Sequence, residues 1–430
     1  MGSHEDNGGP GGWRHWFHRR SVGYIARRII KLVSRYGITS RKAKQRTHDL
    51  VRLLSRYGCA PTLATPGFVI DRNRSFIRRL AEDGVDIAFH GYDHVDFSGL
   101  SREQSHRQVD RAVQAFNDAG IAIGGFRCPY LSYSHDMDGY MPHGLFSYSS
   151  NEALWWDVSD GPQGGAMFDQ LSTFYAATPA KDALILPRRV GDLIEIPVSL
   201  PDDLQLFDGL GSRVDRVGRS WVELLDRVHR DAGVFALLMH PETFWDLAAA
   251  YEALLESAHR RTPAVWLATL QDVAVWWREL ESFGVVRADA SLRLRCSERG
   301  MVLERVDGEG SAVAPGYRAI ESREVAVTGN ELPLLGVERG APDARIARLR
   351  ELGYLVADPT DAARCTVRIE SSLIETATDR ELVAHIEGTP GRLVRFWHWP
   401  DGVRSALCFT GDLDALSLGD YARRLVTLRG

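Results

Sequence analysis

The stretch RSALCFTGDLDALSLGDYARRL, residues 404–425, joins an apolar run to two aspartates. The run at residues 406–410 is typical of a buried strand, and Asp412 and Asp414 follow it two residues apart. Side chains two apart on a strand point to the same face of a sheet, so both carboxylates can reach one pocket. The stretch therefore predicts a strand that delivers two carboxylates to a site, although it lies near the end of a 430-residue chain.

Length and composition are those of a large globular protein. Apolar residues make up 44% of the chain and charged residues 25%, which is the ordinary globular mix. The net charge is −5, yet residues 13–47 carry eleven Lys and Arg and no Asp or Glu. The remainder is an acidic body, so we expect no nucleic-acid partner.

The cysteines and the N-terminal residues bear on location. Five widely spaced cysteines without a CxxC pair indicate a reducing compartment. Residues 1–20 are basic, are expected to be disordered and lack the apolar core of a signal peptide. No apolar run is long enough for a transmembrane helix, so we expect a cytoplasmic protein. Residues 21–36 predict a basic amphipathic helix that packs on the protein, with peripheral membrane contact left open.

Predicted strands and helices alternate over residues 38–285. Helical stretches end at Gly58, Gly84 and Gly120, and short apolar runs such as residues 85–89 lie between them. Such alternation predicts an α/β fold with a parallel sheet or barrel. In folds of this kind the chemistry lies beyond the C-terminal ends of the strands.

The pattern changes further along the chain and predicts four segments. The first is the N-terminal segment 1–20, and the second is the main α/β part, residues 21–285. Residues 288–395 form a smaller α/β accessory module whose role the sequence does not reveal. Residues 396–430 supply a strand and a helix that return to the main part.

Polar clusters follow several of the predicted strands. His90 and His94, in HGYDH, are four residues apart, a spacing that suits two nitrogen ligands of one metal, although two surface histidines can arise by chance. Arg127 opens the cluster RCPY, and arginine can hold a carboxylate with two hydrogen bonds. An apolar run delivers His240 in LLMHPE. Together with the aspartate stretch, these clusters predict one site.

These motifs resemble the polysaccharide deacetylases of the NodB homology type, carbohydrate esterase family four. The motifs of that family are a strand ending in two close aspartates, His-x-x-x-His, Arg-x-Pro-Tyr, and an apolar strand ending in Leu-x-x-His-Pro. This chain has TGDLD, HGYDH, RCPY and LLMHP. The resemblance covers about residues 38–285 and 396–430, and it implies a distorted (β/α) barrel.

The order of the motifs differs from that of the family. The aspartate motif comes first in the family and last here, so the chain resembles a circularly permuted deacetylase whose first strand is C-terminal. Permutation is physically tolerable because the termini of domains usually lie on the surface and often close together.

The resemblance implies a metal centre and a hydrolytic mechanism. It assigns a divalent metal, with Zn²⁺ preferred, to Asp414, His90 and His94. The catalytic residues that it implies are Asp412 as general base, His240 as general acid, Arg127 as the group that orients the base, and Tyr130 through its backbone N–H. If the strand bends at Gly411, the division of roles between the two aspartates stays open.

The resemblance also implies a substrate, an N-acetylated amino sugar in a glycan, glycoconjugate or glycosylated metabolite. Trp155, Trp156, Tyr133 and Phe244 are candidates to stack on sugar rings, although such residues are also common in cores. The fourth motif of the family, a partner for the acid histidine, has no clean match, and Asp202, Asp203 and the tryptophan pair are candidates. Hydrolysis of a non-sugar amide and a silent carbohydrate-binding module remain alternatives, and an oligomer is possible.

Overall fold

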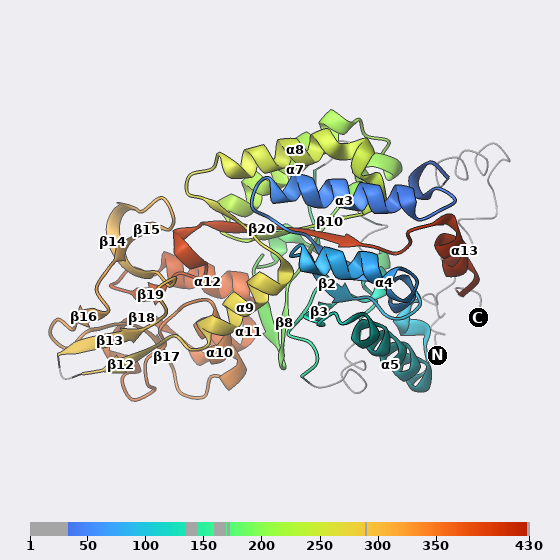
Figure 1. The fold of residues 1–430 in the computed structure, drawn as a ribbon. Coiled ribbons are helices and arrows are strands. Elements are labelled where there is room, and N and C mark those ends of the chain that lie inside the picture. The colour runs from blue at the N-terminus through green and yellow to red at the C-terminus, as the bar shows by residue number, and fades with distance from the viewer. Residues whose placement is uncertain (1–32, 134–143, 159–168, 170–172, 289, 428–430) are drawn as a thin grey trace, which may run out of the picture.

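The computed structural model describes residues 33–133, 144–158, 169, 173–288 and 290–427. A curled sheet lies at the centre, helices cover its outside, and a group of smaller sheets lies at one end (Figure 1). In the described part of the chain, no helix is long and apolar enough to cross a membrane. The predicted disordered segment 1–20 and most of the predicted helix 21–36 lie outside the described residues.

Strand β20 (Ser405–Asp412) lies in the middle of the sheet, and all of its residues are buried. It pairs in parallel with β1 (Thr62–Thr65) on one side and with β10 (Val234–Met239) on the other, and β11 (Val265–Leu267) pairs with its first residues. A strand covered on both faces requires a continuous apolar run rather than an alternating one. The strand predicted from the aspartate stretch is therefore confirmed, and it belongs to the main sheet (Figure 1).

The main sheet is mixed but almost entirely parallel. Its order is β6-β5-β9-β10-β20-β1-β2-β3-β4-β8-β7, and only the pair β7–β8 is antiparallel. The strands not yet delimited are β2 (Asp86–Phe89), β3 (Gly125–Phe126), β4 (Tyr148–Ser149), β5 (Ala153–Trp155), β6 (Thr178–Pro179), β7 (Arg188–Val190), β8 (Leu193–Glu195) and β9 (Val198–Leu200).

The two ends of the main sheet are formed by residues that are close together in the sequence. Strand β4 pairs with β8, and a few residues later β5 pairs with β9. The sheet therefore curls until its ends meet at residues 148–155 and 193–200. The predicted α/β fold is confirmed, and its sheet is mixed and curled.

Strand β3 is much shorter than the apolar stretch at residues 121–130 suggests. A Cβ on Gly125 would lie 2.4 Å from the ring of Tyr148, so this position accepts only glycine. Pro129 then stops the ladder because it has no N–H to donate. The backbone turns immediately afterwards, and this turn carries Tyr130.

Helices cover the outer face of the sheet. Helix α5 begins at a capping box formed by Ser101 and Gln104 and ends at Gly120, whose φ of 66° is left-handed, so the predicted end at Gly120 is confirmed. Figure 1 shows α3, α7 and α8 together on one side of β20, and α4 and α5 on the other. The helices are α3 (Arg41–Ser55), α4 (Gly67–Glu82), α5 (Arg102–Ala119), α7 (Val214–Arg230), α8 (Phe244–His259) and α9 (Leu270–Leu280).

The chain between α9 and β20 forms three small sheets. Their strand orders are β12-β13-β16, β15-β14-β19 and β17-β18. The elements are β12 (Gly284–Arg287), β13 (Ser291–Arg295), β14 (Val302–Gly310), β15 (Pro315–Ile320), β16 (Glu324–Ala326), β17 (Leu332–Val337), α10 (Asp343–Glu351), β18 (Cys365–Ile369), α11 (Ser371–Thr376), α12 (Asp379–Gly388) and β19 (Val394–Phe396). Leu303 and Tyr354 of this segment share one buried apolar cluster with Trp276 and Trp277 of α9. The segment thus packs on the main sheet through α9, and its predicted status as a separate module stays a prediction.

The two ends of the described chain lie together. Helix α13 (Leu418–Thr427) follows β20, and the N–H of Leu418 donates to the carbonyl of Gly37 over 3.1 Å. The rings of Tyr36 and Tyr421 lie 5.5 Å apart. The first described residues and the last helix therefore form one continuous surface beside the end of β20.

We expect Phe409→Ala to lower the free energy of unfolding by about 3–5 kcal/mol, because Phe409 is fully buried in the central strand. Urea denaturation followed by circular dichroism measures the loss. Val275→Ala is the matched control, since Val275 is 54% exposed on α9 and its truncation should change stability by about 0.5 kcal/mol or less. Equal midpoints for both variants would show that β20 does not contribute to the core.

Candidate active site

Two histidines and one aspartate meet beyond the ends of β2 and β20. His90 directly follows β2, and Asp414 lies two residues after β20. The Nε2 atom of His90 lies 3.4 Å from Oδ1 of Asp414, and Nε2 of His94 lies 3.3 Å from Oδ2 of the same carboxylate. One potential ligand atom from each residue lies within 4.8 Å of the others, so the three can hold one ion.

The hydrogen bonding of these residues fits a metal ion. His90 donates from Nδ1 to the backbone carbonyl of Arg127 over 2.7 Å, so the lone pair lies on Nε2. This Nε2 atom and Oδ1 of Asp414 are buried and have no hydrogen-bond partner among the described residues. Buried polar atoms normally have partners, so two such atoms facing each other fit an ion between them.

The protonation states in this cluster also suit a cation. Burial and the nearby Arg424 hold the pKa of His94 well below its ordinary value, so the ring is neutral, as a metal ligand must be. Burial alone would raise the pKa of Asp414, but Arg424 and the two histidines outweigh burial and hold it well below its usual range. The cluster therefore offers two neutral imidazoles and one carboxylate, a set typical of catalytic zinc.

Asp412 lies beside this cluster and is held by Arg127. The guanidinium donates from Nη1 to Oδ1 of Asp412 over 3.1 Å, while Oδ2 lies 3.8 Å from Nε2 of His90. Arg127 is itself fixed by the carbonyl and hydroxyl of Ser150 and by the hydroxyl of Thr410. Asp412 therefore has one oxygen bound to arginine and one facing the cluster, and the side chain is 11% exposed.

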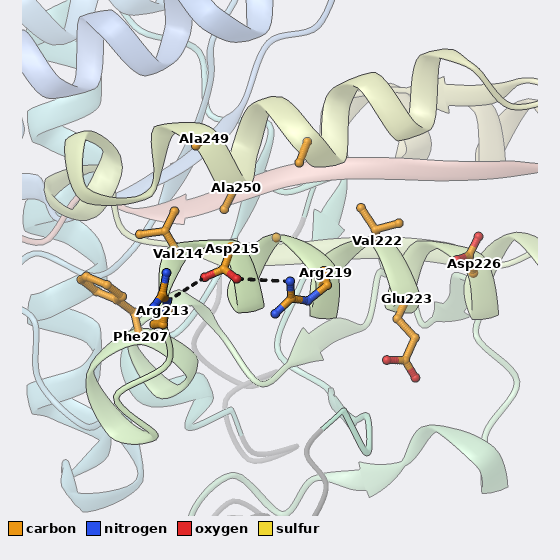
Figure 2. Close-up of a pocket in the computed structure, with 12 residues that line it drawn as sticks. Phe207, Arg213, Val214, Asp215, Arg219, Val222, Glu223, Asp226, Ala249 and Ala250 are labelled. Carbon is orange, nitrogen blue, oxygen red and sulfur yellow. Dashed lines mark hydrogen bonds and ion pairs between the residues drawn. The ribbon is translucent and has the colours of Figure 1, made fainter.

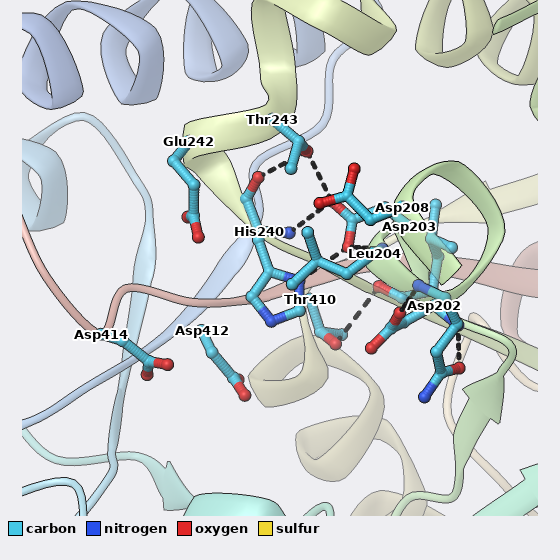
Figure 3. A network of polar contacts seen from close by, with 12 residues as sticks. Asp202, Asp203, Leu204, Asp208, His240, Glu242, Thr243, Thr410, Asp412 and Asp414 are labelled. Carbon is cyan, nitrogen blue, oxygen red and sulfur yellow. Dashed lines mark hydrogen bonds and ion pairs between the residues drawn. The ribbon is translucent and has the colours of Figure 1, made fainter. Parts of the chain in front are cut away.

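The partner of His240 is Asp203. His240 donates from Nδ1 to Oδ1 of Asp203 over 2.7 Å, and its backbone N–H donates to Oδ2 over 2.9 Å. The hydroxyl of Thr243 donates to the same Oδ2 atom. In Figure 3, Asp203 lies on one side of His240, and Asp412 and Asp414 lie on the other. The sequence left Asp202, Asp203 and the tryptophans as candidates for this position, and the structure selects Asp203.

Asp203 also changes the titration of the histidine. Burial would lower the pKa of His240, but the charge of Asp203 and its hydrogen bond outweigh burial and raise the pKa well above its ordinary value. The neighbouring Asp202 has a pKa raised by burial to about 7. The ring of His240 is therefore protonated at neutral pH and has a proton to donate from Nε2.

Tyr130 lies in the turn after β3 with a strained backbone. Its φ is 60°, and that of Leu131 is 56°, both in the left-handed region that non-glycine residues seldom occupy. Such strain persists where surrounding structure imposes it and is concentrated at functional sites. The ring of Tyr130 lies 4.7 Å from that of His94, so the strained turn borders the cluster.

Three residues at the site were not predicted from the sequence. Arg424 of α13 donates to Oδ2 of Asp414, and Tyr36 donates from its hydroxyl to Oε1 of Glu242 over 2.6 Å. The side chain of Glu242 lies near Asp414 and His240 (Figure 3). Glu242 directly follows the LLMHP motif, so its position near the site could have been inferred from the sequence. Nothing in the sequence marks Arg424 or Tyr36 as site residues.

The aromatic residues proposed for sugar stacking lie mostly in the core. Trp155 and Trp156 are each 5% exposed and Phe244 is 6% exposed, while Tyr133 is half-buried against Phe126. Their faces are covered by protein, which disfavours stacking on a substrate. Phe174 is instead 43% exposed, with its ring 6.4 Å from that of Tyr130.

A groove lies away from this cluster, on the helices that cover the sheet. It has a volume of about 1060 Å³ and runs between α7 and α8, where Val214, Gly218, Val222 and Ala250 line it (Figure 2). Arg213 and Arg219 pair with Asp215 along its rim. None of the clustered histidines or aspartates described above lines this groove.

Comparison with known proteins gives one family. The family model for polysaccharide deacetylase matches residues 36–142, which include the histidine pair and RCPY but not the two aspartates. A peptidoglycan deacetylase from Helicobacter pylori is 23% identical over 242 residues, which span 52% of this chain and 81% of that protein.

Two further proteins are similar over a comparable share of this chain. A peptidoglycan deacetylase-like protein from Gibberella zeae is 24% identical over 253 residues, 52% of this chain and 73% of that one. A crystal structure described as that of a polysaccharide deacetylase from Mycobacterium smegmatis aligns with a TM-score of 0.44 and 24% identity, covering 59% of this chain and 82% of the other. Residues 36–142 therefore match the polysaccharide deacetylase family, and the two curated relatives are similar to about half of this chain.

Proposed function

We propose that this protein is a metal-dependent deacetylase that hydrolyses the N-acetyl amide of an amino sugar. The observation that carries the proposal is the meeting of His90, His94 and Asp414 around two unpartnered buried atoms. Asp412 flanks this cluster, and His240 with Asp203 lies beside it (Figure 3). A metal ligand set between a carboxylate and a protonated histidine is an arrangement suited to amide hydrolysis.

His90, His94 and Asp414 would hold the ion, and Zn²⁺ suits their donor atoms best. When bound, such an ion supplies Lewis-acid polarisation of the amide carbonyl and of the attacking water. Asp412 takes the proton from the attacking water, and Arg127 keeps its carboxylate oriented for that step. The N–H of Tyr130 donates to the carbonyl oxygen as negative charge develops there. His240 gives its Nε2 proton to the leaving nitrogen, so that the amine departs neutral.

We also propose that the chain is a circular permutation of the family order. The aspartate strand β20 pairs directly with β1 and β10, and α13 packs against residues 36–37. In the family order the aspartate strand comes first, and α13 would continue into the helix that is α3 here. Helix α13 and the residues before α3 lie close together, so a different order of the chain segments can give the same arrangement of site residues.

The proposed substrate is an N-acetylated amino sugar in a glycan, glycoconjugate or glycosylated metabolite. The relatives named as peptidoglycan deacetylases support this class. A non-sugar amide on the same scaffold and a silent carbohydrate-binding module are the competing functions. Acetate release from a panel of N-acetylated sugars, sugar nucleotides and glycosylated metabolites, with metal analysis of the purified protein, separates the three. A silent module would release no acetate and carry no stoichiometric metal.

We expect Asp412→Asn to abolish acetate release while metal binding persists, because an amide cannot accept the proton of the attacking water. Turnover should fall by about 10²–10⁴-fold, the usual contribution of a general base. Metal content by elemental analysis and activity are measured on the same sample. Asp192→Asn, which alters a carboxylate that is 81% exposed, should leave both unchanged.

His94→Ala makes the complementary change and should lose the metal as well as the activity. Full activity in Asp412→Asn would refute the assignment of the base, and full metal content in His94→Ala would refute the ligand set.

We expect Asp203→Asn to move the alkaline limb of the pH–activity profile to lower pH by about 1–3 units. His240 must be protonated to act as the acid, and its raised pKa keeps activity until pH rises through that pKa. Without the charge of Asp203 the pKa falls, so the proton is lost at lower pH. Initial rates between pH 5 and 10 measure the shift, with the exposed rim residue in Asp215→Asn as control. An unmoved limb would exclude His240 as the acid.

We expect a re-permuted chain to fold and keep its activity. It starts at Asp401, continues through Gly430 directly into Met1, and ends at Pro400, so that the aspartate strand comes first. Asp401 lies in a turn and its side chain is 54% exposed, so opening the chain there breaks few contacts. The control chain is opened between Phe409 and Thr410, inside β20, and should not fold. Loss of folding in the first design would contradict the proposed relation to the family order.

A further inference from the structure

Arg424 of the C-terminal helix binds the same carboxylate that would ligate the metal. Its Nη1 atom donates to Oδ2 of Asp414, and the arginine side chain is 19% exposed. Asp414 is 6% exposed, so the ion pair lies within the protein. A buried guanidinium requires a nearby negative charge, and here that charge belongs to a proposed metal ligand.

The two oxygens of Asp414 have different surroundings. Oδ2 accepts the hydrogen bond from Arg424, whereas Oδ1 is buried and has no hydrogen-bond partner among the described residues. Oδ1 lies 3.4 Å from Nε2 of His90, which is also unpartnered. Oδ2 thus faces both the arginine and Nε2 of His94, which is 3.3 Å away, whereas Oδ1 is directed at His90.

Further contacts keep the guanidinium in this place. Its carbon lies 5.6 Å from the ring centroid of Tyr130, the residue in the strained turn. A fixed positive charge therefore lies beside the cluster at every pH at which the protein is folded.

We propose that Arg424 is a positioning residue that sets the metal affinity of the site, by holding Oδ2 of Asp414 and opposing the charge of an ion at Oδ1. The inference rests on the proposed metal site and adds to it a control of affinity from the last helix. In the metal-free protein the arginine balances Asp414, and in the metal-loaded protein the ion shares that carboxylate with it.

Removing the charge of Arg424 affects metal affinity in two ways, and the two effects have opposite signs. Loss of the hydrogen bond frees the carboxylate to rotate, which weakens metal binding. Loss of a positive charge beside a divalent ion removes repulsion in a poorly solvated site, which strengthens it. Glutamine is two bonds shorter than arginine, so Arg424→Gln removes the charge and also weakens the hydrogen bond to Oδ2. The electrostatic effect should dominate, because charge repulsion acts over a longer distance than a hydrogen bond.

The test compares Arg424→Gln with wild type in two measurements on the full chain. Zn²⁺ affinity is measured by competition with a chromophoric chelator, and thermal unfolding is measured on the metal-free protein. We expect Zn²⁺ to bind more tightly by about 10-fold or more, because the repulsion between the guanidinium charge and a divalent ion is lost. The metal-free variant should melt at lower temperature, because Asp414 loses its counter-ion.

Arg423→Gln is the matched control on the same helix. Arg423 pairs with Asp93 over 2.9 Å, so this variant also loses an ion pair with a carboxylate but not with a proposed ligand. Its Zn²⁺ affinity should equal that of wild type. Arg424→Lys keeps the charge and should also retain the wild-type affinity.

The outcomes separate this inference from the proposed function. Unchanged or weaker Zn²⁺ binding in Arg424→Gln would overturn the inference, because the arginine would then be only a structural partner of Asp414. A variant that folds only with Zn²⁺ present would support it, since the ion replaces the missing charge. A variant that stays unfolded even with Zn²⁺ would overturn it. If folded wild type binds no Zn²⁺, the metal site itself is wrong, and the inference fails with it.

Discussion

The pairing of β20 between β1 and β10 is the constraint on which the site depends. Its register aligns Gly411 with Met239, so Asp412 is level with His240, the next residue after β10. On the other side Asp412 is aligned with Ala64, and Ala64 with Ala88. Asp414 is therefore level with His90, two residues beyond Ala88.

Strand register thus explains how two aspartates in one short motif come to have different neighbours. Asp412 faces the arginine and Asp414 faces the histidines. A slip of one residue would turn both side chains to the opposite face of the sheet. The apolar residues of β20, buried on both faces, oppose such a slip, so the packing of the core maintains the geometry of the site.

Buried charges at the site are balanced in pairs, and this balance sets the protonation of its histidines. Arg127 pairs with Asp412, Arg424 with Asp414, and Asp203 with His240. Burial lowers the pKa of both His94 and His240, yet the two end at opposite extremes. His94 has an arginine nearby and stays neutral, whereas His240 is hydrogen-bonded to a carboxylate and stays protonated. The same residue type can therefore serve as a ligand and as an acid within one pocket.

The α/β fold and the meeting of the motif residues at strand ends could be predicted from the sequence because their signals are local. Apolar runs mark strands and glycines mark helix ends, while His90 directly follows a strand and Asp412 ends one. Asp203 could not be chosen over Asp202 because adjacent residues point in different directions, and only the fold shows which one faces His240.

The burial of the tryptophans and the positions of Arg424 and Tyr36 depend on tertiary contacts. The tryptophans at 155 and 156 are equally compatible with a core and a rim position, and packing placed them in the core. Arg424 and Tyr36 reach the site from opposite ends of the chain, and neither lies in a motif. Long-range contacts of this kind leave no periodic trace in a sequence.

Chain order matters less for this site than spatial order. Strand pairing and burial depend on which segments are adjacent, and a sheet has the same contacts whichever end of the chain supplies its central strand. What permutation changes is the loop closed when strands pair: β20 and β1 are separated by most of the chain here, although they adjoin in space. The entropy cost of closing a loop grows only slowly with its length, so a distant strand can complete the sheet at small thermodynamic cost. The larger consequence is kinetic, because pairing between strands that are far apart in sequence slows folding, and the cluster cannot form until β20 is paired.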